Sequence, residues 1–253
     1  MSLASKIKND LHKLASKPKK SLGQNFLINP RILDKIIAAA EINSNDKVLE
    51  IGPGTGNLTA KLVESAGKVI AIEKDHRLIE VLKEKFKTPN IEITEDDILK
   101  FQPTTHNLQP TTYKVVGNIP YYITSHLIRT VFEEWPQPQL IVLTIQKEVA
   151  QRIVAKPPHM NLLALSVQLY SDPKIVSYVS KNNFKPQPKV DSAIIKLTPS
   201  PKSDKETIEK VLVLAKKAFA GKRKQLKNTI GINSTARPEE LSLSDWINIV
   251  SGK

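Results

Sequence analysis

Cysteine is absent from this chain of 253 residues, which excludes disulfide bonds, thiolate chemistry and metal sites with cysteine ligands. The chain also lacks any apolar run close to the ~20 residues that a membrane-spanning helix requires. The N-terminal stretch, MSLASKIKNDLHKLASKPKK, has no hydrophobic segment of the signal-peptide kind. These absences predict a cytoplasmic protein that does not insert into a membrane, and no residue pattern indicates a metal site.

Acidic residues are outnumbered by basic ones, 25 against 38, and the formal net charge is +13. One basic cluster consists of Lys13, Lys17, Lys19 and Lys20, and a second is KKAFAGKRKQLK at residues 216–227. An excess of this kind is typical of proteins that bind a polyanion, either nucleic acid or an anionic membrane surface. The alternative is a solvated basic face that has no partner.

Short apolar segments alternate with amphipathic ones through the first part of the chain. Strands that are apolar throughout, separated by amphipathic helices, predict a parallel sheet covered on both faces. The expected strands are residues 47–51, 68–73, 91–94, 113–117 and 140–146. The expected helices between and before them are residues 30–40, 56–66 and 76–86.

Two further helical segments follow Gln146, and then two β-rich segments flank the proline-rich stretch NNFKPQPK. Such a hairpin-like pair would add an antiparallel strand to the sheet. The stretch PSPKSDKE has the composition of a linker. We therefore predict an α/β domain over residues 1–200, whose basic residues 1–20 are mobile, and a small helical domain over residues 201–253.

The stretch VLEIGPGTGNLTAKL predicts a strand, a glycine turn and a helix. Gly52, Gly54 and Gly56 allow the backbone to approach a ligand closely, because they carry no side chain. The helix that begins near Asn57 directs its free N–H groups into the same crevice. Glu73 ends the next strand, 21 residues after Gly52, where a carboxylate can bind the two hydroxyls of a ribose.

The glycine spacing indicates which cofactor this site suits. The dinucleotide fingerprint is G-x-G-x-x-G, whereas the glycines here follow G-x-G-x-G, which favours S-adenosylmethionine over a nicotinamide. After the third strand, Asp97 can accept a hydrogen bond from an adenine amino group, and Ile98 can cover the adenine ring. In the alternative reading the glycines only turn the chain and Glu73 is a surface acid, but acids after two successive strands disfavour it.

The stretch VVGNIPYYITS, residues 115–125, follows the fourth strand and reaches the same edge of the sheet. The side-chain oxygen of Asn118 and the carbonyl of Ile119 or Pro120 could accept both hydrogens of an exocyclic amine. The nitrogen lone pair would then point at a methyl sulfonium while Tyr121 stacks on the ring. Alignment and electrostatics, rather than a metal or a strong base, would supply the rate.

A base held in this way must leave its helix, and a second aromatic side chain would help to hold its other face. Phe184 is the candidate, because Pro186 and Pro188 stiffen the loop that carries it. The alternative is that Phe184 is a hydrophobic plug between the hairpin and the sheet.

Six segments in order resemble the ribosomal RNA adenine dimethyltransferases, and NIPYY resembles the Asn-(Leu/Ile)-Pro-Tyr motif of adenine-N6 methyltransferases. The six are KKSLGQNFL, VLEIGPGTGNLT, NIPYYIT, QKEVAQRI, FKPQPKVDSAIIKL and FAGKRKQLKN. The similarity is greatest to the branch that dimethylates two adjacent adenines near the 3′ end of small-subunit (16S) rRNA.

This resemblance implies a Rossmann-like methyltransferase domain followed by a small helical domain. It implies S-adenosylmethionine as the donor and a pre-ribosomal small subunit (pre-30S particle) as the substrate, and we expect a monomer. The cofactor contacts that it implies are Asn25, Leu27, Gly52, Glu73, Asp97 and Asn118. Asn25 and Leu27 follow from the resemblance alone, because GQNFL by its pattern is a turn before a helix, with Phe26 in the core.

Some residues depart from the pattern of the small-subunit branch. Ile119 stands where that branch usually carries Leu, and Ile is commoner in the macrolide-resistance enzymes that methylate large-subunit rRNA. Tyr122, the GPGTG loop and FKPQPKVDSA favour the small-subunit branch. The alternatives are therefore a large-subunit methyltransferase, a non-catalytic nucleic-acid-binding relative, and a small-molecule methyltransferase, which would not explain the charge.

The basic clusters generate a prediction about RNA affinity. We expect phosphate contacts from Lys19, Lys20, Lys222, Arg223 and Lys224. Each neutralised phosphate releases counterions, so the affinity for RNA should fall steeply as salt is raised. Binding titrations at several salt concentrations measure this slope, and a flat response would contradict the assignment.

Overall fold

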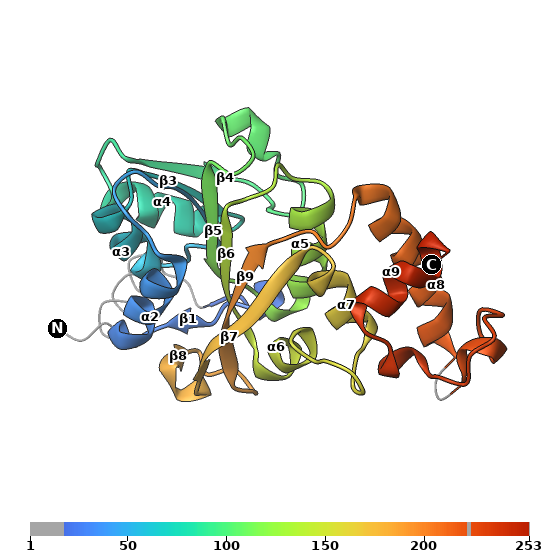
Figure 1. Ribbon diagram of the computed structural model, residues 1–253. Coiled ribbons are helices and arrows are strands. Elements are labelled where there is room, and N and C mark those ends of the chain that lie inside the picture. The colour runs from blue at the N-terminus through green and yellow to red at the C-terminus, as the bar shows by residue number, and fades with distance from the viewer. Residues whose placement is uncertain (1–17, 222–223, 253) are drawn as a thin grey trace. The chain divides into compact units, whose positions relative to one another are not determined.

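The computed structural model describes residues 18–221 and 224–252 (Figure 1). The predicted mobile segment falls mostly on residues 1–17, which lie outside the described residues. The chain forms two compact units, one of Met1–Lys147 with Ile175–Leu197 and the other of Glu148–Lys174 with Thr198–Lys253. Within the described residues, no helix combines the length and apolar character that a membrane crossing requires.

The predicted boundary at residue 200 needs a correction, because the second unit also contains Glu148–Lys174. Helix α7 (Leu162–Gln168) buries Ala164, Leu165 and Val167 and packs against helix α8 (Lys205–Ala220). An apolar helix face must be buried against a neighbour, and this neighbour lies later in the sequence. A contact between segments so far apart in the chain leaves no trace in local composition.

The first unit is built around a seven-stranded sheet with the order β4-β3-β2-β5-β6-β9-β7. Pairs β2–β3, β2–β5, β3–β4 and β5–β6 are parallel, and β6–β9 is antiparallel, which confirms the predicted mixed sheet. The strands are β2 (Lys47–Ile51), β3 (Lys68–Glu73), β4 (Ile91–Glu95), β5 (Tyr113–Asn118), β6 (Leu140–Gln146), β7 (Ser171–Val179) and β9 (Ser192–Pro199).

The sheet is covered on both faces. Successive strand residues point to opposite faces, yet Val48 and Leu49 in β2, and Val115 and Val116 in β5, are all fully buried. The helices of the first unit are α2 (Pro30–Ala40), α3 (Asn57–Ser65), α4 (His76–Lys85) and α5 (Thr124–Glu133).

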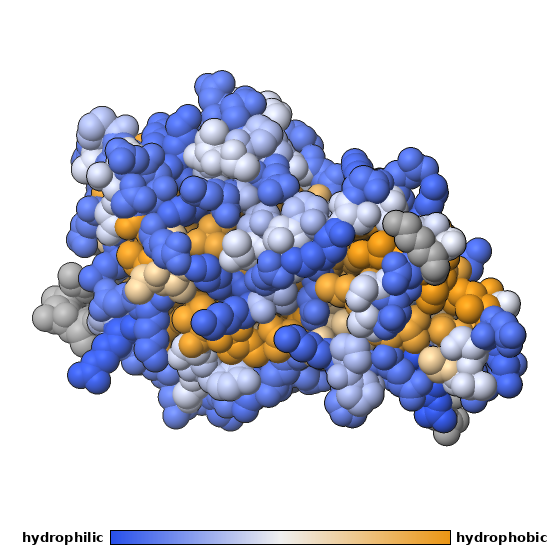
Figure 2. All heavy atoms as spheres, viewed as in Figure 1, coloured by the Kyte–Doolittle hydropathy of each residue, from blue (hydrophilic) through white to orange (hydrophobic). Residues whose placement is uncertain are grey.

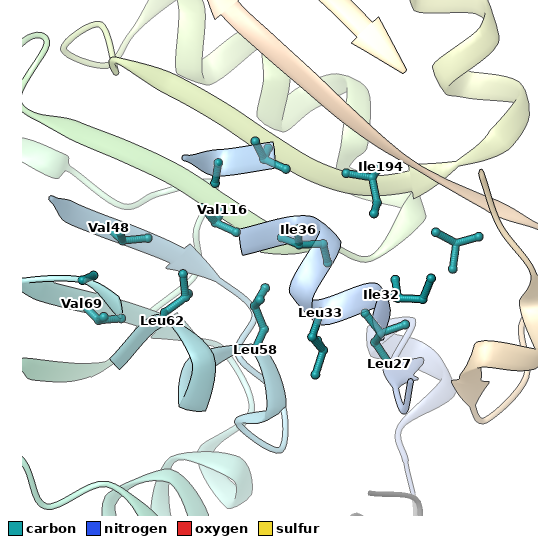
Figure 3. Close-up of a cluster of buried hydrophobic side chains, with 14 of the residues drawn as sticks. Leu27, Ile32, Leu33, Ile36, Val48, Leu58, Leu62, Val69, Val116 and Ile194 are labelled. Carbon is teal, nitrogen blue, oxygen red and sulfur yellow. The ribbon is translucent and has the colours of Figure 1, made fainter. Parts of the chain in front are cut away.

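Helices α2 and α3 form the core on one face of the sheet. Leu33 and Ile36 of α2 lie with Leu58 and Leu62 of α3 over strand residues such as Val116 (Figure 3). Local sequence favours α2 at that place, because Asn29 caps its N-terminus and Pro30 occupies its first turn. The core therefore fixes α2 and α3 beside the end of strand β2.

A separate two-stranded sheet joins distant parts of the first unit. Strand β1 (Phe26–Leu27) pairs antiparallel with β8 (Phe184–Lys185), with Leu27 opposite Phe184 (Figure 1). This pairing brings the GQNFL segment to the proline-rich loop, although more than 150 residues separate them in the chain.

The second unit is mainly helical, and it also contains α9 (Leu243–Ser251) and all of α6 (Lys147–Ile153) except the first residue. Trp246 of α9 is fully buried, and its ring stacks on that of Phe219 of α8 at 6.0 Å between centroids. Asp204 caps α8, and a capping box of Ser242 and Asp245 begins α9. The buried faces of α8 and α9 pack on each other, and the caps fix where these two helices begin.

Candidate active site

A cavity opens in the first unit at the carboxyl ends of strands β2, β3 and β5, where open parallel sheets bind ligands. It measures about 1150 Å³, including the space at its open mouth. The structure brings all of the predicted cofactor-binding residues to its walls. They are Asn25, Leu27, Gly52, Gly54, Glu73, Asp97, Ile98 and Asn118. Pro120 and Tyr121 line the same cavity, so the predicted donor and acceptor sites are contiguous.

The glycine turn has the backbone shape that its sequence predicts. Gly52 and Gly54 have φ angles of +66° and +61°, which side chains disfavour. A Cβ atom on Gly54 would also come within 2.9 Å of the Phe26 ring. Gly54 is therefore required for two reasons, and Phe26 is buried as expected.

Glu73 is held at the cavity wall by three backbone donors. Its carboxylate accepts from the N–H groups of Gly54 at 3.1 Å and of Lys74 and Asp75 at 2.9 Å each. Burial raises the pKa of Glu73 above its ordinary value, and these three donors offset part of that rise. The geometry leaves carboxylate lone pairs available for ligand hydroxyls.

Asp97 lines the cavity and already has two partners in this structure. Its Oδ2 lies 2.7 Å from Lys74 Nζ, and its Oδ1 accepts from the N–H of Leu99 at 3.2 Å. The hydrogen bond and charge of Lys74 hold the pKa of Asp97 below its ordinary value. A ligand amine that reaches Asp97 must share this carboxylate with Lys74, a cavity residue that sequence reasoning missed.

Glu50 and Asn57 present buried oxygens without partners at the same cavity. Among the described residues, neither carboxylate oxygen of Glu50 nor Asn57 Oδ1 makes a hydrogen bond, and the adjacent Thr59 hydroxyl is not in hydrogen-bonding geometry with Glu50. Burial raises the pKa of Glu50 to about 8, and the charge of Glu73 adds to the effect. Buried acceptors without partners are costly, so this wall suits a ligand that brings N–H donors and positive charge. Glu50 was not among the predicted site residues, although its sequence context, an acid within the apolar run VLEI, could have indicated it.

The N-terminal segment 19–27 is tethered across the cavity. Its side chains reach Asp75, which accepts from Gln24 Nε2 at 2.8 Å and lies 3.4 Å from Lys19 Nζ. Its backbone is held as well, because Asn57 Nδ2 donates to the carbonyl of Leu27 at 3.1 Å. These contacts hold the GQNFL turn against the glycine turn and helix α4, so that its residues line the cavity.

Asn118 joins the acceptor motif to this segment. Its Nδ2 donates to the carbonyl of Asn25 at 2.9 Å, and its Oδ1 makes no hydrogen bond among the described residues. Tyr121 is anchored through its hydroxyl, which lies 2.7 Å from Ser192 Oγ, and burial raises its pKa. A fixed carboxamide with a free oxygen beside a fixed ring suits a flat, amine-bearing substrate.

Phe184 lies in the core and does not line the cavity. It is 2% exposed, belongs to the cluster around α2, and pairs with Leu27 across β1 and β8. In this structure Phe184 therefore packs as the plug alternative describes, and its stacking on a base stays a prediction. Pairing of β1 with β8 draws this side chain inward.

Only part of the predicted RNA surface can be located. Lys19 lies beside the cavity through its contact with Asp75, and Lys224 is exposed in the second unit. Lys222, Arg223 and the side chain of Lys20 lie outside the described residues. The phosphate contacts stay predictions.

Comparison with known sequences gives matches over almost the whole chain. A family model described as Ribosomal RNA adenine dimethylase matches residues 15–251. A Ribosomal RNA small subunit methyltransferase A from Dehalococcoides mccartyi (strain CBDB1) is 41% identical, covering 97% of this chain and 91% of its own. A protein of the same name from Mycoplasmopsis synoviae (strain 53) is 43% identical, covering 93% and 92%.

Solved structures of methyltransferases are also similar to this chain over most of its length. A dimethyladenosine transferase from Plasmodium falciparum has a TM-score of 0.75 and 32% identity, covering 88% of this chain and 95% of that one. The 23S rRNA methyltransferase ErmE has a TM-score of 0.74 and 27% identity, covering 90% and 98%. The similarity thus extends over the cavity and the helical part of the chain.

The charge on Asp75 generates a stability prediction. Burial alone would raise its pKa, but hydrogen bonds from Arg77 and Gln24 and the charges of Arg77 and Lys19 outweigh it, so the pKa lies below its ordinary value. A carboxyl of this kind stabilises the fold above its unfolded pKa, and that stability is lost as pH falls through the folded value. Asp75→Asn should therefore cost about 1–3 kcal/mol at pH 7, and the cost should shrink only below the ordinary aspartate pKa, so that it is clearly smaller at about pH 2.

Denaturant unfolding at the two pH values measures the difference. Asp34→Asn is the matched control, because its ion pair with Lys61 is solvent-exposed and should contribute little to stability at either pH. Equal losses for Asp75→Asn at about pH 7 and about pH 2 would contradict the assigned role of the charge.

Glu50 should have the opposite effect on stability. Because its folded pKa is raised, its contribution is present below the unfolded pKa and is lost as pH rises toward about 8. Glu50→Gln removes this loss, so the ligand-free variant should exceed the parent in stability by a few kcal/mol at pH 8, and by less at pH 5. Urea unfolding across this range measures the gap, and parallel curves for the two proteins would refute the prediction.

Proposed function

Because the chain belongs to the ribosomal RNA adenine dimethylase family, we propose that it dimethylates the N6 amino groups of two adjacent adenines near the 3′ end of small-subunit rRNA, with S-adenosylmethionine as donor. The observation that carries this proposal is the free carboxamide oxygen of Asn118, at the cavity that Glu73 and the glycine turn also line. One cavity can therefore receive the donor and the target amine together.

The cavity residues fit the donor. When bound, S-adenosylmethionine supplies a methyl group activated by a sulfonium centre. The partnerless oxygens of Glu50 and Asn57 match an ammonium group, which carries three N–H donors and a positive charge. Glu73 would accept from ribose hydroxyls and Ile98 would cover the adenine, while Gly52 permits close backbone approach.

The acceptor residues would work by orientation. Asn118 Oδ1 and the carbonyl of Ile119 or Pro120 would accept the two amine hydrogens, which disfavours delocalisation of the nitrogen lone pair into the ring. Tyr121, fixed through Ser192, would stack on the base. The alkylated amine is acidic and can lose its proton to solvent, so alignment and fixed dipoles would supply most of the rate.

The proposal extends to the physiological setting. The substrate would be a pre-ribosomal small subunit, the enzyme would act as a monomer, and the compartment would be the cytoplasm. The net charge of +13 supports a ribosomal substrate, because association with RNA depends on phosphate neutralisation.

The large-subunit alternative has less support. Ile119 is its one specific feature, and the 23S rRNA methyltransferase ErmE is 27% identical to this chain. Two proteins named as small-subunit methyltransferases are 41% and 43% identical over most of their length.

Replacement of Asn118 tests the proposed chemistry. Asn118→Ala removes both the amine acceptor and the bond to Asn25, so methyl transfer to unmethylated small subunits should fall roughly 100-fold or more in kcat. Affinity for RNA should change little, because the carboxamide contacts no phosphate. Transfer of labelled methyl groups and filter binding measure the two quantities.

Asn45→Ala is the matched control, because Asn45 is exposed and precedes the amino end of β2, whereas the cavity lies at the carboxyl ends of the strands. It should retain full activity. Full turnover by Asn118→Ala would remove Asn118 from its assigned role, and transfer by the intact enzyme to large subunits instead of small ones would refute the proposed substrate.

A further inference from the structure

We propose that Tyr178 and Lys147 form a shelf on which a nucleotide close to the target adenine stacks. This inference rests on the proposed function and adds the place where RNA continues beyond the reacting base. Both residues belong to the first unit.

Tyr178 is an unusual surface residue. Hydrophilic residues form most of the surface in Figure 2. Within the described residues, Tyr178 is one of few large apolar side chains that are exposed, with 52% of its surface accessible. Its hydroxyl makes no hydrogen bond among those residues, and Val179, the next residue, is buried. The ring therefore serves neither the core nor a polar network that the described residues form.

Lys147 supplies positive charge at the same place. Its Nζ lies 5.2 Å from the centroid of the Tyr178 ring, within the range of a cation–π contact. An aromatic ring beside a lysine is the combination with which proteins hold single-stranded nucleic acid, since bases stack on rings and cations contact the backbone.

The shelf is connected to the acceptor side of the cavity. The N–H of Lys147 donates to the carbonyl of Asp191 at 3.0 Å, and the carboxylate of Asp191 accepts from the N–H of Lys181 at 3.0 Å. The next residue, Ser192, bonds the hydroxyl of Tyr121. A short chain of direct contacts therefore joins Tyr178 to the ring proposed to hold the adenine.

The order of the strands in the sheet gives an approximate distance between Asn118 and Tyr178. Asn118 ends β5, Lys147 follows β6, Ser192 begins β9, and Tyr178 lies near the end of β7, in the order in which these strands neighbour one another. Three strand spacings correspond to roughly 14 Å. RNA whose target adenine occupies the cavity could reach Tyr178 within a few nucleotides.

The surrounding charge favours RNA over a protein partner. Lys181, Lys185 and Lys189 are exposed in the loop that follows Tyr178, and the one acid there, Asp191, is engaged by the backbone of Lys181. An apolar protein surface would gain little from these lysines, whereas phosphates would neutralise them.

Tyr178→Ala tests the shelf directly. Loss of one base–aromatic stack should weaken binding of single-stranded RNA from the 3′ region of small-subunit rRNA by roughly 5- to 100-fold. The KM for small subunits should rise, while kcat and the affinity for S-adenosylmethionine stay unchanged. Tyr178→Phe keeps the ring and should behave as the parent, and Val213→Ala, at another exposed apolar residue, is the surface control.

A spectroscopic readout separates stacking from a structural role. In RNA with 2-aminopurine placed in turn at each position flanking the target adenine, the parent and Tyr178→Phe should quench one position, and Tyr178→Ala should not. Lys147→Ala should lower the slope of log affinity against log salt by about one.

Two results would overturn the shelf. The first is parental RNA affinity and quenching in Tyr178→Ala. The second is a defect of Tyr178→Ala with protein-containing subunits but not with free RNA, which would assign the surface to a ribosomal protein. Either result, with methylation by the parent intact, would leave the proposed function standing, whereas absence of methylation by the parent would contradict that function independently.

Discussion

The hydrogen bond from Asn118 Nδ2 to the backbone carbonyl of Asn25, 2.9 Å long, is the contact on which the site depends. It connects the acceptor motif at the end of β5 with the N-terminal segment 19–27. It also fixes the carboxamide with its oxygen unengaged. Segment 19–27 is in turn held by Asp75 and Asn57, so one network of side-chain hydrogen bonds shapes both halves of the cavity.

The site is built at some cost to the stability of the ligand-free fold. Glu50 is buried with no partner among the described residues, and Glu73 is buried with its pKa raised. Buried carboxyl groups of this kind destabilise a protein at neutral pH, and a bound ligand that supplies donors offsets that cost. Asp75 acts in the opposite sense, because its cationic neighbours make the ionised form favourable. Asp75 thus stabilises one side of the site in the ligand-free protein, whereas the buried acceptors of Glu50 would gain hydrogen-bond partners from a bound ligand.

Local sequence patterns predicted the parts of the molecule that depend on neighbouring residues. The parallel strands, the glycine turn and the positions of Glu73 and Asn118 follow from periodicity and from the geometry of strand ends. Pairing of β1 with β8, the inward position of Phe184, and the packing of α7 on α8 depend on residues far apart in the chain. The contact of Lys74 with Asp97 could not be read from spacing, because it depends on side-chain conformations across two strands. Asn25 and Leu27 were found through family resemblance, since their approach to the cavity is created by tertiary tethers.

In the proposed reaction, one cavity presents a methyl donor to the amino group of an adenine in small-subunit rRNA. The decisive measurement methylates unmethylated small subunits to completion, with S-adenosylmethionine labelled in its methyl group, and then maps the label on the RNA. We expect label on N6 of two adjacent adenines near the 3′ end of the small-subunit rRNA. Label on another atom, on another class of RNA, or on no RNA would contradict it.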